Sequence, residues 1–276
     1  MPLLKSFEHQ GVEGFQFMRL FWGRPTVMVT CYYVDGVLID TAQHNLAKYV
    51  IARLSQKKIE KILLTHYHED HTGNLKALQA VHQAQVYAGW ETAKKVKKGF
   101  SIKPYAHIFF GNIETYAGQI EHLPDQIESK NCVFTPIFTP GHSPDHYVFL
   151  EKNRGWLFSG DLYIGHIKLM RPEESIGDMI NSIKKILDYD FDALFCAHRP
   201  VIKGGKQALQ SKLNYLEDFY GKVVTIYHQG FDHIEIQRKL GLKDSLWLKW
   251  WFSSEVGVDH MVKSVIKSEQ KTKAAY

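Results

Sequence analysis

Four potential metal ligands lie within six residues of this 276-residue chain, at His66, His68, Asp70 and His71. They follow an apolar run at 59–65 that is typical of a buried strand, so they lie on a loop whose start is held by a sheet. Protonated histidines this close would repel one another without a ligand, which makes a plain surface turn the less favoured interpretation. Imidazole and carboxylate ligands together favour zinc, iron or manganese. The motif therefore predicts a transition-metal site.

Three further candidate ligands occur later in the chain, each after an apolar run and beside glycine or proline. They are His142, Asp161 and His198. Taken singly, such a residue is more often structural than a ligand. Together with the first motif, they form an ordered series of loop ligands, which strengthens the prediction of a metal site.

The pattern along the chain predicts an α/β fold followed by a helical segment. Two β-rich runs flank Asp35-Gly36, which predicts a hairpin over 27–40. Other strands are predicted at 59–65, 85–88, 133–138, 147–150, 156–158 and 193–196, and helices at 44–56, 74–83 and 175–188, the last capped by Ser175. Beyond Gly204-Gly205 only helical periodicity remains. We therefore expect an α/β domain at 1–205 and a helical C-terminal domain at 206–276, in which a small helical hairpin is favoured over a winged-helix-like module.

In order and spacing, these motifs resemble those of the metallo-β-lactamase-fold hydrolase superfamily, over roughly residues 20–205. The resemblance implies a four-layer αββα sandwich with two metal ions at one edge. The implied ligands are His66, His68 and His142 for one ion, Asp70, His71 and His198 for the other, and Asp161 as the bridge. It also implies that Asp70 can relay a proton to the leaving group. Asp40 would orient a ligating imidazole without itself binding the metal, or alternatively cap the following turn.

The resemblance implies a dinuclear hydrolase that uses a metal-bridging hydroxide, with two divalent ions, Zn²⁺ first and Fe or Mn as alternatives. The first hypothesis is hydrolysis of a small thioester or ester, as in the glyoxalase II group of hydroxyacylglutathione hydrolases. The second is a phosphodiesterase or single-strand ribonuclease, as in relatives of beta-lactamase-like protein 2. The third is an iron-dependent persulfide dioxygenase on the same fold.

Three residues near the last two ligand motifs are predicted to line a substrate pocket. They are Tyr163, His166 and Arg199, for each of which a surface position is the alternative. A cation at Arg199 favours an anionic small-molecule substrate. An aromatic cluster at 247–252 could stack nucleic-acid bases, but such clusters more often dock a helix, so nucleic acid is not the favoured partner.

The composition of the chain indicates its cellular compartment. Its three cysteines are widely spaced, which argues against a disulfide framework and for a reducing compartment. We see neither an export signal at the start nor an apolar run of membrane-spanning length, so we expect a cytoplasmic protein without a membrane partner. The sequence carries no indication of oligomeric state.

Overall fold

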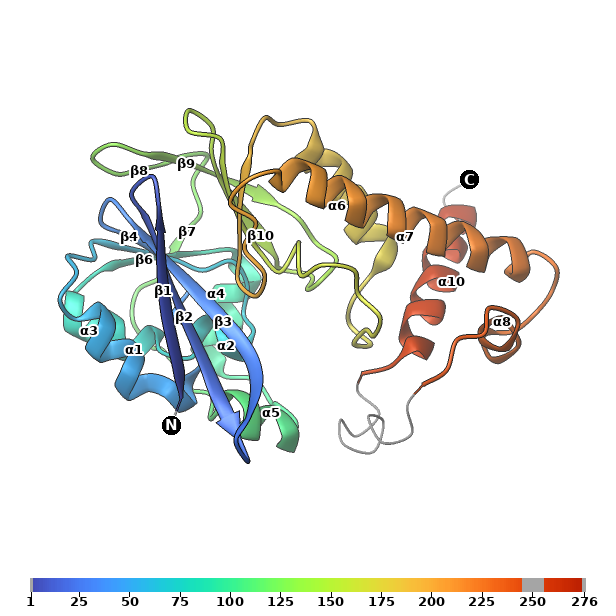
Figure 1. The fold of residues 1–276 in the computed structure, drawn as a ribbon, viewed down its shortest axis with the longest axis horizontal. Helices are drawn as coiled ribbons and strands as arrows, with labels where there is room; N and C mark the ends of the chain where they lie inside the picture. Colours follow the sequence, from blue (N-terminus) through green and yellow to red (C-terminus); the bar gives the residue numbers. More distant parts are fainter. Residues whose placement is uncertain (1, 245–255, 275–276) are drawn as a thin grey trace.

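The computed structural model describes residues 2–244 and 256–274, and it contains two β-sheets packed face to face (Figure 1). The first sheet has seven strands in sequence order. They are β1 (Leu3–His9), β2 (Val12–Phe21), β3 (Arg24–Val34), β4 (Val37–Ile39), β5 (Lys61–Leu63), β6 (Gln85–Ala88) and β7 (Glu121–His122). Strands β1 to β4 pair antiparallel, whereas β4 to β7 pair parallel.

The second sheet has five strands in the order β12-β11-β10-β9-β8. They are β8 (Ile127–Glu128), β9 (Val133–Phe138), β10 (Tyr147–Glu151), β11 (Trp156–Gly160) and β12 (Ala193–Cys196). Only the β11–β12 pair is parallel, because helix α6 connects these two strands.

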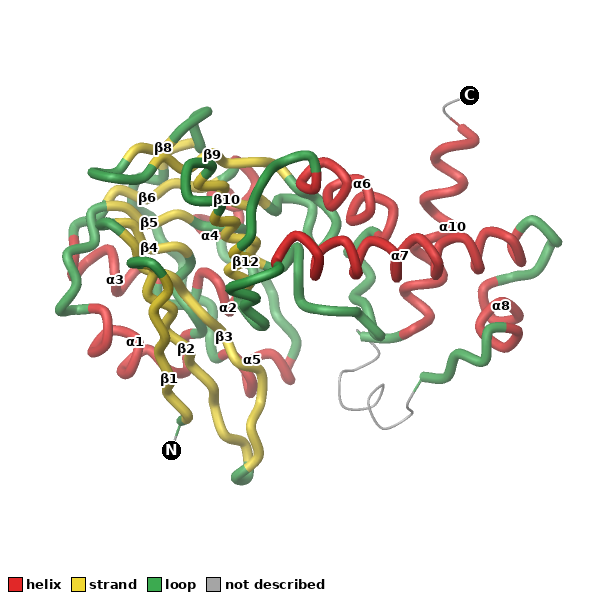
Figure 2. The backbone as a smooth tube through the Cα atoms, turned by 45° about the horizontal axis from the view of Figure 1, so that its top comes forward, coloured by secondary structure: helices red, strands yellow, loops and turns green. Residues whose placement is uncertain are grey.

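Helices cover the outer face of each sheet (Figure 2). On the first sheet lie η1 (His44–Leu46), α1 (Ala47–Leu54), α2 (Glu69–Thr72), α3 (Leu75–His82), α4 (Trp90–Lys98) and α5 (Pro104–Phe110). On the second lie α6 (Ile176–Leu187) and α7 (Gly205–Tyr227), while α10 (Val258–Ala274) packs on α6 and α7, and α8 (His233–Lys239) packs on α7 and α10. No helix in the described ranges combines the length and apolar character needed to cross a bilayer.

Three apolar clusters hold these layers together. One lies between the first sheet and its helices, a second lies between the two sheets, and a third joins the second sheet to α6, α7, α8 and α10. In the middle cluster, Tyr32 of the first sheet meets Phe158 and Phe195 of the second, with ring centroids 5.7 and 5.3 Å away. This order of layers is the predicted αββα sandwich, which is confirmed.

The predicted elements are present with ends shifted by a few residues. The hairpin turn forms at Asp35 and Gly36, whose φ angles of +50° and +82° suit the tight two-residue turn that an Asp-Gly pair favours. Ser175 caps α6 as expected, since its Oγ accepts a hydrogen bond from the Asp178 backbone N–H at 3.3 Å. Strands β1, β2, β7 and β8 and helices α2 and α5 were not predicted from the sequence.

The C-terminal helices share one apolar cluster with α6 and the second sheet. Leu213 of α7, Val262 of α10 and Ile183 of α6 belong to it together with Leu157 of β11. Three helices make up the described part of the C-terminal region, and the division into domains at 1–205 and 206–276 stays a prediction. The aromatic cluster at 247–252 lies outside the described residues.

Candidate metal centre

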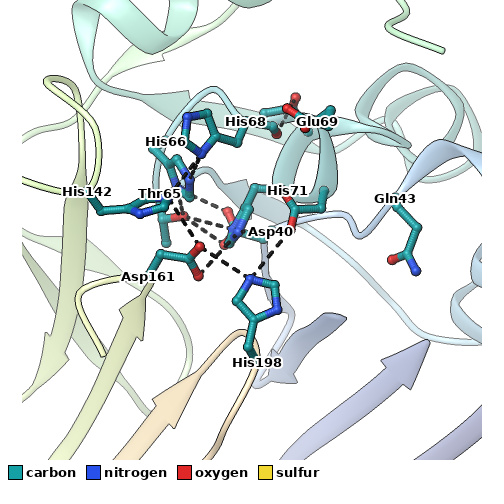
Figure 3. Close-up of polar contacts among 12 residues, drawn as sticks. Asp40, Gln43, Thr65, His66, His68, Glu69, His71, His142, Asp161 and His198 are labelled. Atoms are coloured by element: carbon teal, nitrogen blue, oxygen red, sulfur yellow. Dashed lines mark hydrogen bonds and ion pairs between the residues drawn. The ribbon is translucent and has the colours of Figure 1, made fainter. Parts of the chain in front are cut away.

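The ligand motif leaves the first sheet directly after β5. His66 and His68 lie on the extended stretch that follows the strand, and Asp70 and His71 lie on the short helix α2. All four side chains are buried. The other three candidates come from the second sheet, where His142 lies between β9 and β10, Asp161 directly follows β11, and His198 follows β12. The site therefore lies where the edges of both sheets meet (Figure 3).

Three imidazoles converge at one point of the site. His68 Nδ1 lies 2.9 Å from His66 Nε2 and 3.0 Å from His142 Nε2. Burial and the neighbouring imidazoles hold the pKa of His66 and of His68 well below the usual range. Neutral rings present lone pairs, which is the state that binds a metal ion.

A second group forms around Asp70, His71 and His198. Asp70 Oδ2 lies 3.5 Å from His198 Nε2 and 3.9 Å from His71 Nε2. Asp161 lies between the two groups, because its Oδ2 is 3.2 Å from both His142 Nε2 and His198 Nε2 (Figure 3). All seven side chains that the sequence predicted as ligands are therefore brought together.

The unpaired atoms of this cluster fit metal ions. His71 Nε2 and Asp161 Oδ1 are buried and have no hydrogen-bond partner among the described residues, although they lie 3.5 Å apart. Buried polar atoms are nearly always paired, so orphaned atoms facing one another indicate a missing partner. Three ligand triads have donor atoms within 4.8 Å of one another: His66, His68 and His142; His66, His71 and Asp161; and Asp70, His71 and His198. Nitrogen and carboxylate donors at this spacing suit two divalent transition-metal ions.

The second ring nitrogen of three candidate ligands bonds to an acceptor that orients the ring. Asp40 Oδ2 lies 2.7 Å from His71 Nδ1, and Glu174 Oε1 lies 2.7 Å from His142 Nδ1. The carbonyl of Met28 lies 2.7 Å from His198 Nδ1. Such partners fix the tautomer and orientation of a metal-binding imidazole.

Asp40, for which the sequence left support of an imidazole and capping of a turn both open, contacts His71 and Thr65. Its two carboxylate oxygens also accept hydrogen bonds from the backbone N–H and the hydroxyl of Thr65, at 2.9 and 2.8 Å. Glu174 was not predicted, because it acts on His142 across 32 residues of sequence and no local motif marks it.

His146 was not predicted as a site residue either. Its ring is fully buried, and its Nε2 accepts a hydrogen bond from the Asp161 backbone N–H at 3.0 Å. Its Nδ1 lies 2.9 Å from the Thr139 hydroxyl, and burial holds its pKa well below the usual range. A neutral His146 therefore fixes the backbone of Asp161. Its position four residues after His142 was the one available signal.

The three predicted pocket residues lie apart from the described cavities. His166 Nε2 lies 3.2 Å from the Ser211 hydroxyl, and its ring stacks on Tyr215 with centroids 4.7 Å apart, so it contacts α7. Arg199 is exposed and lies beside Gly165, while Tyr163 packs partly against the core below α6 and α7. Their role in substrate binding stays a prediction.

A cavity of about 260 Å³ lies directly beside His68. Tyr67 and Phe100 form an aromatic wall, with their rings edge to face at 4.9 Å. The Nζ of Lys95 lies 3.3 Å from the centre of the Tyr67 ring. Arg171 pairs with buried Glu69 at 3.6 Å on another wall. The cavity thus offers an apolar aromatic side and a polar side next to the candidate ligands.

Comparisons with known proteins agree with this geometry. Residues 24–198 match the family described as the Metallo-beta-lactamase superfamily. The chain is similar to a beta-lactamase-like protein 2 homolog of Drosophila melanogaster, with 26% identity over 60% of this chain and 56% of the relative. It is also similar to an atrochrysone carboxyl ACP thioesterase of Aspergillus fumigatus, with 25% identity over 65% of this chain and 52% of the relative.

Both curated relatives are matched over little more than half of their own length. Among solved structures, a metallo-beta-lactamase family protein of Thermus thermophilus superposes with a TM-score of 0.68. It is 16% identical, and the match covers 94% of each chain, so the likeness extends to the C-terminal helices as a likeness of fold.

Proposed function

The chain belongs to the metallo-beta-lactamase superfamily, and we propose that it is a dinuclear metal-dependent hydrolase of small thioesters or esters. The observation that carries the proposal is the position of Asp161 between two ligand groups, 3.2 Å from a histidine of each. His66, His68 and His142 would hold one ion, and Asp70, His71 and His198 the other. Zn²⁺ is the proposed ion, and iron or manganese are the alternatives.

Bound divalent ions of this kind supply a water of lowered pKa and stabilise the developing oxyanion. The protein's own part is to hold the ligands still, through Asp40, Glu174 and the Met28 carbonyl. Asp70 is the proposed proton carrier to the leaving group, as the family resemblance implies, and its Oδ2 lies 3.5 Å from His198 Nε2 in the second ligand group. Burial raises the pKa of the thiols of Cys31, Cys132 and Cys196, so these thiols stay protonated, which supports water as the nucleophile.

Two observations support a thioester substrate. One relative is an acyl-carrier thioesterase by name. The cavity beside His68 also has room for an acyl group against Tyr67 and Phe100, within reach of the polar side chains of Arg171 and Glu69. We therefore propose that the acyl part of the substrate occupies this cavity.

Single-strand ribonuclease activity is the second candidate function, and it is supported by the similarity to a beta-lactamase-like protein 2 homolog. Its test is whether binding of a single-stranded RNA weakens steeply with salt, because phosphate contacts release counterions. An iron-dependent dioxygenase stays the third alternative, to be recognised by iron content and oxygen consumption.

We also propose a cytoplasmic location and a boundary near residue 205 between catalytic and helical domains. The location is supported by three cysteines that are all unpaired thiols in the described structure.

The proposal is tested on protein reconstituted with Zn²⁺. The substrates are S-lactoylglutathione, a short-chain acyl-pantetheine thioester and a single-stranded RNA, each assayed before and after treatment with a chelator. We expect thioester hydrolysis that is lost with the chelator and restored by Zn²⁺. RNA cleavage without thioester hydrolysis would replace the first function by the second, and hydrolysis insensitive to chelation would contradict both.

A further inference from the structure

The segment after Asp161 is held by the C-terminal helix α7. Three side chains from one stretch of α7 bond to it. Lys212 Nζ donates to the Leu162 carbonyl at 2.7 Å, and the Tyr215 hydroxyl donates to the Ile167 carbonyl at 2.6 Å. The Ser211 hydroxyl lies 3.2 Å from His166 Nε2. The helix that begins after the last candidate ligand thus returns to the loop of the bridging aspartate.

Lys212 is unusual because its side chain is fully buried. An ammonium group removed from water is costly unless it is well paired. Burial lowers the pKa of Lys212 only to about 8, so the group still carries its proton in most molecules near pH 7. Docking of α7 needs no such cation, because Leu209, Leu213 and Leu216 already bury the apolar face of the helix. A buried lysine at this position therefore requires another reason.

The position of the Leu162 carbonyl, which accepts the hydrogen bond from Lys212, offers that reason. Leu162 is the residue after Asp161, and the N–H of Asp161 itself is held by His146 at 3.0 Å. The backbone around Asp161 is thus fixed on one side by buried His146, directly before β10, and on the other by buried Lys212 of α7. The Asp161 carboxylate must reach both ligand groups at once, so a small shift of this backbone would remove one contact.

We propose that Lys212 is a positioning residue that holds the Asp161 carboxylate between the two ligand groups through the Leu162 carbonyl. The C-terminal helix is then part of the metal centre, although it supplies no ligand among those predicted. This inference rests on the proposed dinuclear site and adds to it a residue that the ligand motifs do not include.

The test compares Lys212→Met with Tyr215→Phe as a matched control. Lys212→Met keeps the length of the side chain and removes the donor next to Asp161. Tyr215→Phe removes a donor from the same helix to the same segment, but at Ile167, six positions beyond Asp161. Zn²⁺ affinity is measured by competition with a chromophoric chelator, and thermal stability is measured on the same samples.

We expect Lys212→Met to weaken Zn²⁺ binding about 10- to 100-fold, as loss of a supporting partner does at other metal sites. Tyr215→Phe should stay within about twofold of wild type by the same measure. At saturating Zn²⁺, Lys212→Met should lower kcat with little change in KM, whereas Lys212→Arg, which keeps a donor, should recover part of the affinity. The proposal would be overturned if Lys212→Met bound Zn²⁺ as tightly as the wild type. It would also be overturned if Lys212→Met and Tyr215→Phe lost Zn²⁺ affinity equally.

A measurement on the wild-type protein covers the case in which Lys212→Met does not fold. Zn²⁺ should slow amide exchange at 161–167 and in the turn of α7 around Lys212 more than in the distal turn at 220–227. Equal slowing of both turns would overturn the proposal. If the wild type binds no divalent metal, the proposed function has failed. If it binds two ions and Lys212→Met does too with equal affinity, only the inference on Lys212 has failed.

Discussion

At the scale of single residues, three of the five candidate histidine ligands have an orienting acceptor at the second ring nitrogen. His142 faces Glu174, His71 faces Asp40, and His198 faces the Met28 carbonyl. A carboxylate or carbonyl acceptor keeps the proton on that nitrogen and leaves the other nitrogen free to bind a metal ion. Ligand and partner therefore act as a unit, and removal of the partner should weaken metal binding while the ligand remains.

Glu174 offers a direct test of this dependence. We expect Glu174→Ala to weaken Zn²⁺ binding about 10- to 100-fold, because the His142 ring loses its orienting acceptor. The adjacent Glu173→Ala is the control, since Glu173 is exposed and does not bond to a candidate ligand in the described structure. Unchanged affinity in Glu174→Ala, measured by chelator competition, would show that the partner has no such role.

The cavity beside His68 makes a separate prediction for Phe100. Phe100→Ala removes one ring of the aromatic wall. Loss of about 1.4 kcal/mol of acyl contact would raise KM about tenfold, with metal content unchanged. Phe138→Ala, which alters an exposed ring on β9, should leave KM as it is. If steady-state kinetics give Phe100→Ala the same KM as the wild type and Phe138→Ala, the acyl group does not bind in this cavity.

Residue spacing predicted the ligands but not the residues that orient them. The seven candidate ligands were named from the sequence because each follows a strand and carries a recognisable neighbour. His146 and Glu174 were not named, because their roles arise from contacts between loops that the sequence places far apart. A local pattern holds no information about such contacts.

At the scale of elements, turns and strand ends set the ligand positions. Gly141 precedes His142 with a φ of +143°, and a Cβ there would lie 2.6 Å from the backbone of Met179 in α6. Only glycine lets this loop approach α6 so closely. The close approach brings His142 near Glu174, which lies two residues before α6.

Two glycine substitutions test this reasoning in opposite directions. Gly141→Ala should lower the free energy of unfolding by about 3 kcal/mol, from the steric clash and the unfavourable φ. Gly221→Ala should raise it by about 0.5–1 kcal/mol, because Gly221 lies within α7 with open space around its Cα. Urea denaturation checks both values. A neutral Gly141→Ala would mean that the loop does not need its close contact with α6.

Strong turn and cap signals explain which elements the sequence predicted. The Asp35-Gly36 turn and the Ser175 cap were both found in place. Strand β1 was missed because its side chains are mostly exposed and polar, so it lacks the alternation that marks a half-buried strand. Helix α5 was missed because it has only seven residues, and periodicity over so short an apolar run does not identify a helix.

At the scale of the whole molecule, the candidate centre joins the two sheets. His66 to His71 come from the first sheet, whereas His142, Asp161 and His198 come from the second. The resemblance to a known family predicted this sandwich, but it did not predict how α7 returns to the loop after Asp161. That contact depends on the packing of the C-terminal helices against α6, which helical periodicity alone does not determine.

Metal ions bound across the two sheets should stabilise the folded chain. With free Zn²⁺ at about a thousand times its Kd, the expected gain is about 4 kcal/mol in the free energy of unfolding. A chelator should therefore lower Tm of the wild type clearly, and it should shift Tm of Asp161→Ala much less. Differential scanning fluorimetry measures the Tm shift of each protein. An equal shift in the two proteins would indicate that the ions bind elsewhere.

Metal stoichiometry of wild type and Asp161→Ala, measured by elemental analysis on tag-free protein, tests the central claim most directly. We expect two divalent ions per wild-type chain and at most one in Asp161→Ala, because the bridging carboxylate is shared by both ligand groups. Two ions in both proteins, or none in the wild type, would contradict the proposed dinuclear centre.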